Sequence, residues 1–480
     1  TGANGTVAIG YTAGQDLTSG AANTVIGYES GKALTTGGSN ISLGYQAHLA
    51  LVSGDNNVAI GVNAADAMAV GESENIAIGT SALGGMDEGT AGGDIDGNIA
   101  IGHAALVGGD LAGNDRQVQD NIAIGRNALN STSDNTQTGT IAIGKDALTA
   151  LTSGTGNIAI GYQAAQTHTT GVRNIAIGAN AMDDTDAGGS SKDSNDNVFI
   201  GTDSGGGTWA NASSNYNIGI GSYTLDGALD GAGGNVAIGY QVMSALTTAD
   251  NMVAIGYQAA ENSSTGGNSI VIGKDAGRYI YNANNSILIG FSAGEYIGQG
   301  NTGATDSVHI GFTTGKYSTG SYNTFVGAEA GVGGTTSAPY SAGEQNTAVG
   351  YQALKSFTNI DASLNTAIGY QAGQSVQDGN ANTYLGSRAG QAQTVGDANL
   401  AIGDRALYSD TSGHRTIAIG KDALHAFSGS GTTTFNSDIT KIIAIGYHAA
   451  YNMGSVPGGS FPNATRSSNN IVIGYEAAYT

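Results

Sequence analysis

The amino-acid sequence predicts an all-β protein, a parallel β-solenoid of about 25 coils. A motif of Asn, a β-branched residue, Ala, Ile and Gly, followed after any two residues by Ala, recurs 25 times along the chain. Eleven of the 24 spacings between copies are 17 residues, and the others run from 16 to 28. Each copy has the composition of a short strand closed by Gly. The 17-residue basic repeat is too short for a helix pair, which needs about 33 residues.

The first element of each repeat is the strand, as in Asn157-Ile158-Ala159-Ile160-Gly161. Side chains alternate between the two faces of a strand. The residue before the Gly is Ile, Leu or Val in all 25 copies, and the residue three before it is Val, Ile, Leu or Thr. We therefore expect this face to be the core of the coil.

The other strand face carries the residue two before the Gly, which is Ala in 15 copies and never charged. An uncharged second face is typical of strands that are covered on both sides. Because a thin solenoid has no second layer, we expect another copy of the chain to cover it; the alternative is an exposed alanine face on a monomer. The predicted chain-chain interface consists of Ala8, Ala59, Ala77, Ala100, Ala123, Ala142, Ala159, Ala176, Ala237, Ala254, Ala348, Ala367, Ala401, Ala418 and Ala444.

The remainder of each repeat forms the turn that returns the chain to the next strand. Asn stands four residues before the Gly in 17 of 25 copies, which predicts a ladder of Asn side chains along one edge. Residues 1–480 are expected to form a single continuous array, a segment of a longer fibre. Longer spacings predict loop insertions at 86–97, 107–120, 183–196, 428–441 and 451–468.

The composition excludes several classes of partner. The chain has 80 Gly, no Cys and a net charge of -22, so disulfides and Cys-ligated zinc are excluded. The negative charge repels nucleic-acid phosphates and anionic lipids. Apolar runs are shorter than the ~18 residues that span a bilayer, so no membrane insertion is expected in this segment.

The Asn-x-Ala-Ile-Gly-x-x-Ala repeat resembles the head repeats of trimeric autotransporter adhesins, the YadA-like head, and similar repeats in bacteriophage tail fibres. The resemblance covers nearly the whole chain. It implies a left-handed β-roll, a homotrimer, and an extracellular place on a cell surface or virion. It also implies attachment to a surface glycan or protein receptor.

Residues that could carry chemistry are scattered. The loops at 94–96, 183–186 and 193–196 are rich in Asp and could hold calcium, but a solvated acidic loop is the simpler interpretation. The seven His lie in different coils without zinc-ligand spacing. No Gly-x-Ser-x-Gly motif or phosphate loop is present. The sequence thus predicts no catalytic residue, no metal site, no cofactor and no enzyme activity.

Aromatic residues are the candidate binding groups. Ten of the 22 Tyr directly follow the repeat Gly, where stacking along the array is expected. Aromatic side chains elsewhere are candidate contacts for sugars or proteins, because a flat ring buries much area with little loss of rotamer freedom. These candidates are Trp209, Tyr216, Tyr279, Tyr281, Tyr296, Tyr317, Tyr322 and Tyr340.

These observations favour a non-enzymatic structural fibre or adhesin that attaches to surfaces or host cells through loops on a repetitive rod or filament. A bacteriophage tail fibre that binds a receptor is the main alternative. A glycan-active β-helix enzyme would need aligned acidic or basic residues on successive rungs, and we find none. An ice-binding solenoid would need a continuous Thr ladder, which Thr18, Thr35-Thr36 and Thr169-Thr170 do not form.

Overall fold

The computed structural model contains two compact units, Thr1–Thr248 and Ala249–Thr480. The predicted continuity of residues 1–480 between these units stays a prediction. The structure describes residues 2–86, 94–109, 117–132, 136–185, 193–281, 284–297, 305–334, 341–357, 362–426, 442–452 and 470–478. These residues contain short strands and turns and no α-helix.

Each unit is built from strands of two to four residues. The strands of the first unit are β1 (Val7–Ile9), β2 (Thr24–Ile26), β3 (Ile41–Leu43), β4 (Val58–Ile60), β5 (Ile76–Ile78), β6 (Asp94–Asp96), β7 (Ile99–Ile101), β8 (Gln117–Gln119), β9 (Ile122–Ile124), β10 (Gln137–Thr138), β11 (Ile141–Ile143), β12 (Ile158–Ile160), β13 (Ile175–Ile177), β14 (Val198–Ile200), β15 (Ile218–Ile220) and β16 (Val236–Ile238). Those of the second unit are β17 (Val253–Ile255), β18 (Ile270–Ile272), β19 (Ile287–Ile289), β20 (Val308–Ile310), β21 (Thr324–Val326), β22 (Thr347–Val349), β23 (Thr366–Ile368), β24 (Thr383–Leu385), β25 (Leu400–Ile402), β26 (Ile417–Ile419), β27 (Ile442–Ile445) and β28 (Asn470–Ile473).

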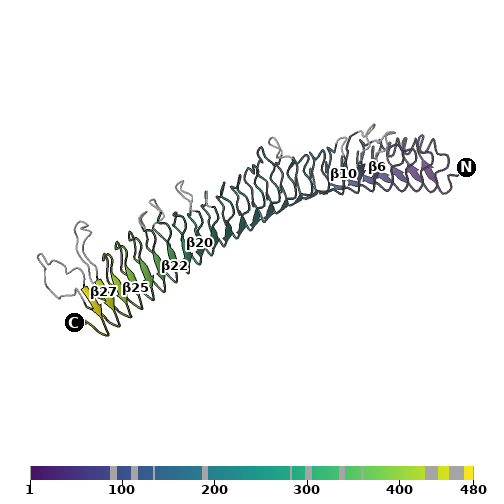
Figure 1. Ribbon diagram of the computed structural model, residues 1–480. Helices are drawn as coiled ribbons and strands as arrows, with labels where there is room; N and C mark the ends of the chain where they lie inside the picture. Colours follow the sequence, from purple (N-terminus) through teal and green to yellow (C-terminus); the bar gives the residue numbers. More distant parts are fainter. Residues whose placement is uncertain are drawn as a thin grey trace. The chain divides into compact units, whose positions relative to one another are not determined.

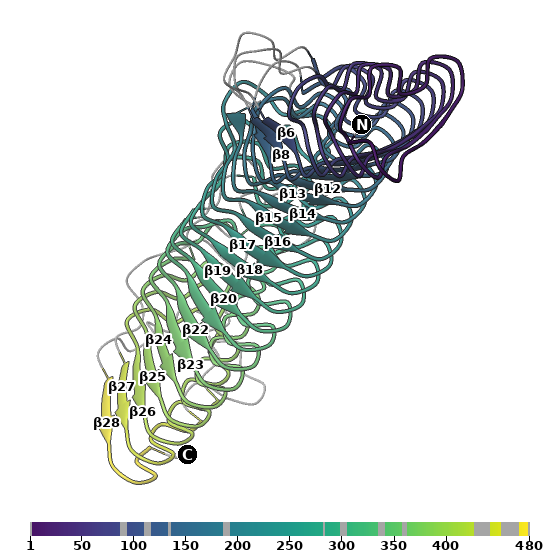
Figure 2. The same ribbon diagram turned by 90° about the vertical axis from the view of Figure 1, so that its right-hand side faces the viewer.

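Successive repeats pair in parallel and in register, so each turn contributes one strand to the sheet. Ala142 of β11 pairs with Ala159 of β12, which pairs with Ala176 of β13. In the second unit Ala401 of β25 pairs with Ala418 of β26 in the same way. Within each unit the strands lie side by side, and the turns project from them (Figures 1 and 2). The predicted parallel β-solenoid is therefore confirmed.

The repeat Gly permits this close stacking. At Gly161, with φ of 147°, an added Cβ would overlap the carbonyl oxygen of Gly178 in the next turn. The same overlap would occur at Gly144, against the oxygen of Gly161. A larger residue would strain the backbone and separate the turns.

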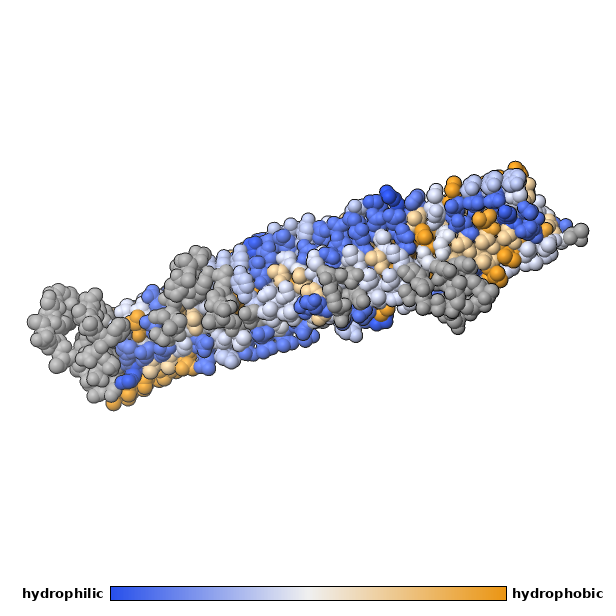
Figure 3. Space-filling model, turned by 90° about the horizontal axis from the view of Figure 1, so that it is seen from above, coloured by the Kyte–Doolittle hydropathy of each residue, from blue (hydrophilic) through white to orange (hydrophobic). Residues whose placement is uncertain are grey.

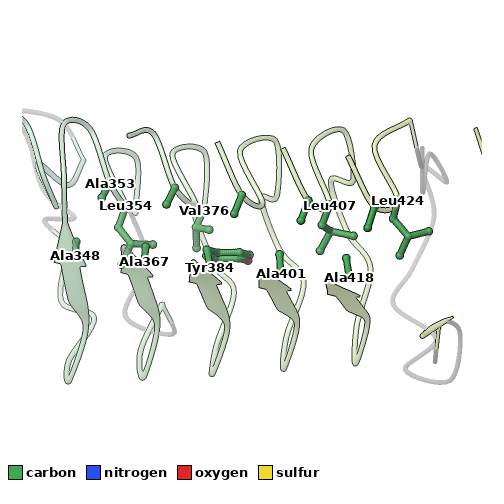
Figure 4. Packing of buried hydrophobic residues seen from close by; sticks show 14 of the residues in the cluster. Ala348, Ala353, Leu354, Ala367, Val376, Tyr384, Ala401, Leu407, Ala418 and Leu424 are labelled. Carbon is green, nitrogen blue, oxygen red and sulfur yellow. The ribbon is translucent and has the colours of Figure 1, made fainter. Parts of the chain in front are cut away.

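The faces of the strand are the reverse of those predicted. The residue two before the Gly points into the coil and is fully buried, as for Ala59 and Ala159, whereas Ile158 and Ile160 on the opposite face are partly exposed. Figure 4 shows Ala348, Ala367, Ala401 and Ala418 directed from their strands into the coil. The predicted core face therefore lies on the outside of the coil.

The predicted interface of alanines is wrong for the same reason. Fourteen of these alanines are 0–1% exposed within their own chain, from Ala59 to Ala444, and Ala8 of the first turn is exposed. The coil is narrow, so a small residue fits opposite the returning turn, which supplies buried side chains such as Ala164 and Leu151. A second chain cannot reach side chains that their own coil encloses.

Where the inward residue is large, the turn opposite it carries Gly. Phe199 faces Gly205, Phe325 faces Gly331 and Tyr384 faces Gly390, and an added Cβ on each Gly would overlap the ring. In ordinary turns a small residue such as Ala142 faces a large one, Leu148, and both are fully buried. This size exchange keeps the interior close-packed.

The predicted Asn ladder is confirmed inside the coil. The backbone N–H of Asn57 donates to Oδ1 of Asn40 at 2.9 Å, and that of Asn75 donates to Oδ1 of Asn57 at 2.9 Å. The Asn57 Nδ2 group donates to the carbonyl of Glu72 at 2.7 Å. Each Asn thus satisfies buried backbone groups in its neighbouring turn.

The predicted loop insertions are described only in part. Insertion 428–441 lies outside the described residues, as do portions of the other four. Two of the predicted insertions contain strands and are not only loop. Their strands, β6 and β8, form a second parallel sheet with β10.

Candidate functional surface

The main candidate surface is the outer aliphatic face, which we define as the residues one and three before each repeat Gly. These residues are Ile, Val, Leu or Thr in every copy. They are partly exposed along both units, with values of 40% at Ile41 in the first unit and 44% at Leu385 in the second. In-register pairing places identical side chains next to one another, as for Ile141, Ile158 and Ile175. Each unit therefore presents an aliphatic surface along its sheet.

An aromatic row borders this face, because the residue directly after the repeat Gly is often Tyr or Phe. Tyr11, Tyr28 and Tyr45 stack with ring centroids 5.2 Å apart. Tyr351 and Tyr370 stack at 5.5 Å. The predicted stacking of the tyrosines after the Gly is confirmed at these positions, and all five rings are exposed. The aromatic row widens the apolar surface.

Polar residues occupy much of the remaining surface. Figure 3 shows long hydrophilic rows, with hydrophobic atoms gathered in separate patches. Among the described residues, several acidic side chains on this surface form ion pairs. Arg173 Nε contacts Asp196 Oδ1 at 2.6 Å, and Arg278 Nε contacts Glu261 Oε2 at 2.6 Å. The Arg173 side chain is largely exposed, and exposed pairs of this kind contribute little to stability, whereas the Arg278 pair is partly buried.

Trp209 is not a binding residue, contrary to the sequence prediction. Its side chain is fully buried and packs at 70° against the ring of Phe199, with centroids 5.8 Å apart. Its Nε1 donates to the carbonyl of Gly205 at 3.0 Å. The residue fills space beside the large inward ring of its turn, and ligands cannot reach it.

The predicted tyrosines differ in accessibility. Tyr216, Tyr281 and Tyr322 are exposed by 66%, 44% and 54%. Tyr340 lies outside the described residues. The three exposed tyrosines remain candidates for contacts with a receptor.

Tyr279, Tyr296 and Tyr317 form a partly buried stack, with centroids 4.9 and 5.2 Å apart. Arg278 lies over the Tyr279 ring, and Lys316 lies over the Tyr317 ring. Because neighbouring rings and cations cover their faces, these tyrosines present edges and hydroxyls. A sugar that packs on a ring face has little access to them.

Buried histidines occupy positions in the coil interior. Burial lowers the pKa of His48 and of His309 to about 3 and that of His168 to about 4. Nδ1 of His48 lies 2.8 Å from Ser42 Oγ, and Nδ1 of His168 lies 3.1 Å from Thr185 Oγ1. His309 stacks on Phe325 at 5.0 Å. These side chains are neutral parts of the core.

Burial shifts pKa values in the acidic loops. Burial raises the pKa of Asp183 to about 6, and it also raises that of Asp96. Asp186 lies outside the described residues. Within the described part of the chain, no group of three His, Asp or Glu side chains is arranged to hold a metal ion.

No protein-family model matches the chain, and no curated protein matches its sequence. Across the described ranges, none of the secondary structure is a helix of the length and apolarity that a membrane span requires.

Proposed function

We propose that the chain is a non-enzymatic structural fibre protein that assembles through its outer aliphatic face and attaches to surfaces through exposed turn residues. The exposure of this face carries the proposal. Contiguous apolar surfaces of such extent are characteristic of interaction sites. The face has no charged side chain in any repeat, so no charge on it opposes burial against an identical face.

The proposed partner is another copy of the same chain. Every copy of the chain has the same sequence and therefore presents the same row of aliphatic side chains, which suits a symmetric assembly. The resemblance to the heads of trimeric adhesins supports three copies, a left-handed coil and an extracellular location. The proposed packing differs from the sequence prediction, because isoleucines and valines would take the place of alanines at the interface.

Attachment is proposed to depend on avidity. Tyr216, Tyr281 and Tyr322 would occur once in each copy of an assembly, so weak contacts with a glycan or protein receptor would combine. Linking modules in this way raises overall binding by about 10²–10⁴-fold when the sites can engage together. No catalytic group is needed for this activity.

The assembly test uses a double substitution on β12, Ile158→Glu with Ile160→Glu. Two buried carboxylates at a chain-chain interface would lack partners and would prevent association. We expect multi-angle light scattering to give an oligomeric mass for the unaltered chain and a monomeric mass for the variant. Circular dichroism should show the same β-sheet content in both proteins.

Ser153→Glu with Thr155→Glu is the matched control, because both residues lie in the turn of the same repeat, are at least partly exposed and stand outside the outer aliphatic face and the aromatic row beside it. This variant should keep the oligomeric mass. A monomeric unaltered chain, or an oligomer that persists in the Ile158→Glu, Ile160→Glu variant, would contradict the proposed assembly.

A further inference from the structure

Two neighbouring turns of the second unit carry long polar side chains at a position that is aliphatic in many turns. The residue seven after the repeat Gly is a buried aliphatic side chain in many turns, including Leu34, Leu151 and Val376. In the turns that follow Gly386 and Gly403, the equivalent residues are Gln393 and Asp410. Both are fully buried.

Hydrogen bonds to one residue, Gly413, link these two side chains. Gln393 Nε2 donates to the carbonyl of Gly413 at 3.0 Å, and the N–H of Gly413 donates to Asp410 Oδ1 at 3.0 Å. The N–H of Ser412 also donates to this oxygen, at 3.2 Å. The other oxygens, Oε1 of Gln393 and Oδ2 of Asp410, have no hydrogen-bond partner.

Tyr384 supplies a third buried polar atom. It lies in β24, in the same turn as Gln393, and its ring crosses the interior opposite Gly390. Figure 4 shows the hydroxyl end of Tyr384 directed toward Ala401, in the turn to which Asp410 belongs. The hydroxyl has no partner and is fully buried. Burial raises the pKa of Tyr384, and the charge of nearby Asp410 raises it further.

Tyr384 and Gln393 belong to one turn and Asp410 to the next, and none of their three unpaired polar atoms bonds to another. Leaving each of them unsatisfied in the core is costly. Two are acceptors, the oxygens of Gln393 and Asp410, and the third is a hydroxyl that can donate. Water complements this set, because one molecule donates two hydrogen bonds and accepts others. Buried waters typically make about three hydrogen bonds to otherwise unpaired polar groups.

We propose that Tyr384, Gln393 and Asp410 form an interior binding site for a single water molecule. The water donates to Asp410 Oδ2 and Gln393 Oε1 and accepts from the Tyr384 hydroxyl. It therefore bridges two turns through side chains, in addition to the strand hydrogen bonds. In the described part of the chain the second carboxylate oxygen of Asp410 has no hydrogen-bond partner, and the water would supply one.

A high-resolution crystal structure of the full chain tests the proposal directly. We expect one peak of electron density about 2.7–3.2 Å from each of the three oxygens. Direct hydrogen bonds among the three side chains, with no density between them, would overturn it. Metal-like density with oxygen ligands at about 2.3–2.6 Å would also overturn it, because the guest would then be a cation.

A solution measurement gives a second test. Oxygen-17 magnetic relaxation dispersion counts long-lived internal waters in the folded protein. The variant with Tyr384→Phe, Gln393→Leu and Asp410→Leu should lose one such water relative to the unaltered chain. Gln391→Leu is the control, because this half-buried side chain in the same turn bonds to Gln371 and Gln374 instead. An unchanged count in a folded triple variant would overturn the proposal.

Discussion

His309 shows how a single buried residue contributes to the response of the second unit to acid. It occupies the inward position of β20, between Leu288 of β19 and Phe325 of β21. Neither ring nitrogen has a hydrogen-bond partner. An added Cβ at Gly294 or Gly315 would crowd the ring, so backbone encloses it on both sides. Among the described residues, burial alone accounts for the lowered pKa, with no contribution from a neighbouring charge.

The sign of the pH effect follows from the pKa of His309, which burial lowers from 6.5 to about 3. As the pH falls below 6.5, the unfolded chain takes up the proton before the folded chain does. The stability of the folded state is therefore lost progressively between these two values. At about pH 4 the loss amounts to roughly 3 kcal/mol.

We predict that His309→Leu removes this acid sensitivity. The variant should lose roughly 3 kcal/mol less stability than the unaltered chain between pH 7 and about pH 4. Urea unfolding of both proteins at the two pH values measures the difference. Exposed His103 provides the control His103→Leu, which should behave as the unaltered chain does. An equal acid response in all three proteins would contradict this account of His309.

At the scale of the strand and its turn, the Asn ladder accounts for the most frequent polar residue of the motif. Replacing Asn57 by Ala would leave the N–H of Asn75 and the carbonyl of Glu72 without their partners, and both bonds are buried. We predict a loss of about 2–4 kcal/mol in the free energy of unfolding, because each buried unpaired group costs about 1–3 kcal/mol.

Asn57→Ser is the matched comparison and should cost less. The chain itself uses Ser at this position in three successive turns, where the N–H of Ser286 donates to Ser269 Oγ at 3.1 Å. Ser keeps the acceptor, but its hydroxyl donates to a carbonyl of its own turn, as Ser286 Oγ does to Asn284 at 3.1 Å, and no longer to the neighbouring turn. Equal losses for Ala and Ser in denaturant unfolding would show that the ladder acceptor contributes nothing.

The pairing of a large inward strand residue with Gly in the opposite turn leads to a further prediction. Phe199→Ala alone should cost about 3–5 kcal/mol by leaving a cavity. Gly205→Leu alone should also destabilise, because the new side chain would overlap the Phe199 ring.

The double variant restores the common arrangement of Ala142 and Leu148 and should recover at least half of the summed loss. Thermal unfolding of the three variants forms a double-mutant cycle. Additive losses would contradict direct packing between these two positions.

The sequence correctly predicted the strand, its parallel in-register stacking and the Asn ladder, because each depends on local repetition. It did not correctly predict which strand face is inside. Both faces are uncharged, and the larger residues, which usually indicate a core, lie on the outer face. Two signals pointed the other way. Asn shares a face with the alanines, and it must reach backbone inside the coil. Large inward residues such as Phe199 and Tyr384 also have Gly six positions later, which is the spacing that packing across the coil requires.

The binding residues were harder to predict because exposure depends on neighbouring turns. Trp209 and Tyr216 are close in sequence, yet Trp209 packs under the chain beside Phe199, and Tyr216 is exposed. Composition alone did not distinguish these environments. The insertions that form β6 and β8 were missed because Asp94-Ile95-Asp96 and Gln117-Val118-Gln119 lack the motif and its Gly.

At the scale of the whole molecule, the chain combines an aliphatic outer face with a strongly acidic remainder. The net charge of -22 comes from residues outside the outer aliphatic face. Charge of one sign keeps proteins apart where polar surfaces meet. We therefore expect association to be restricted to the uncharged face, which gives a defined assembly instead of general aggregation. The trimer and its handedness stay predictions.

Thiol accessibility tests the central claim most directly, because the chain contains no natural Cys. Ile160→Cys places one thiol on the outer aliphatic face, and Thr155→Cys places one at an exposed turn residue of the same repeat. The rate of maleimide labelling is measured for each native protein and in denaturant. Burial of the outer face between copies predicts that Cys labelling at position 160 is slowed by roughly 100-fold or more until the protein unfolds, whereas position 155 labels at once. Equally rapid labelling of both native variants would contradict the account.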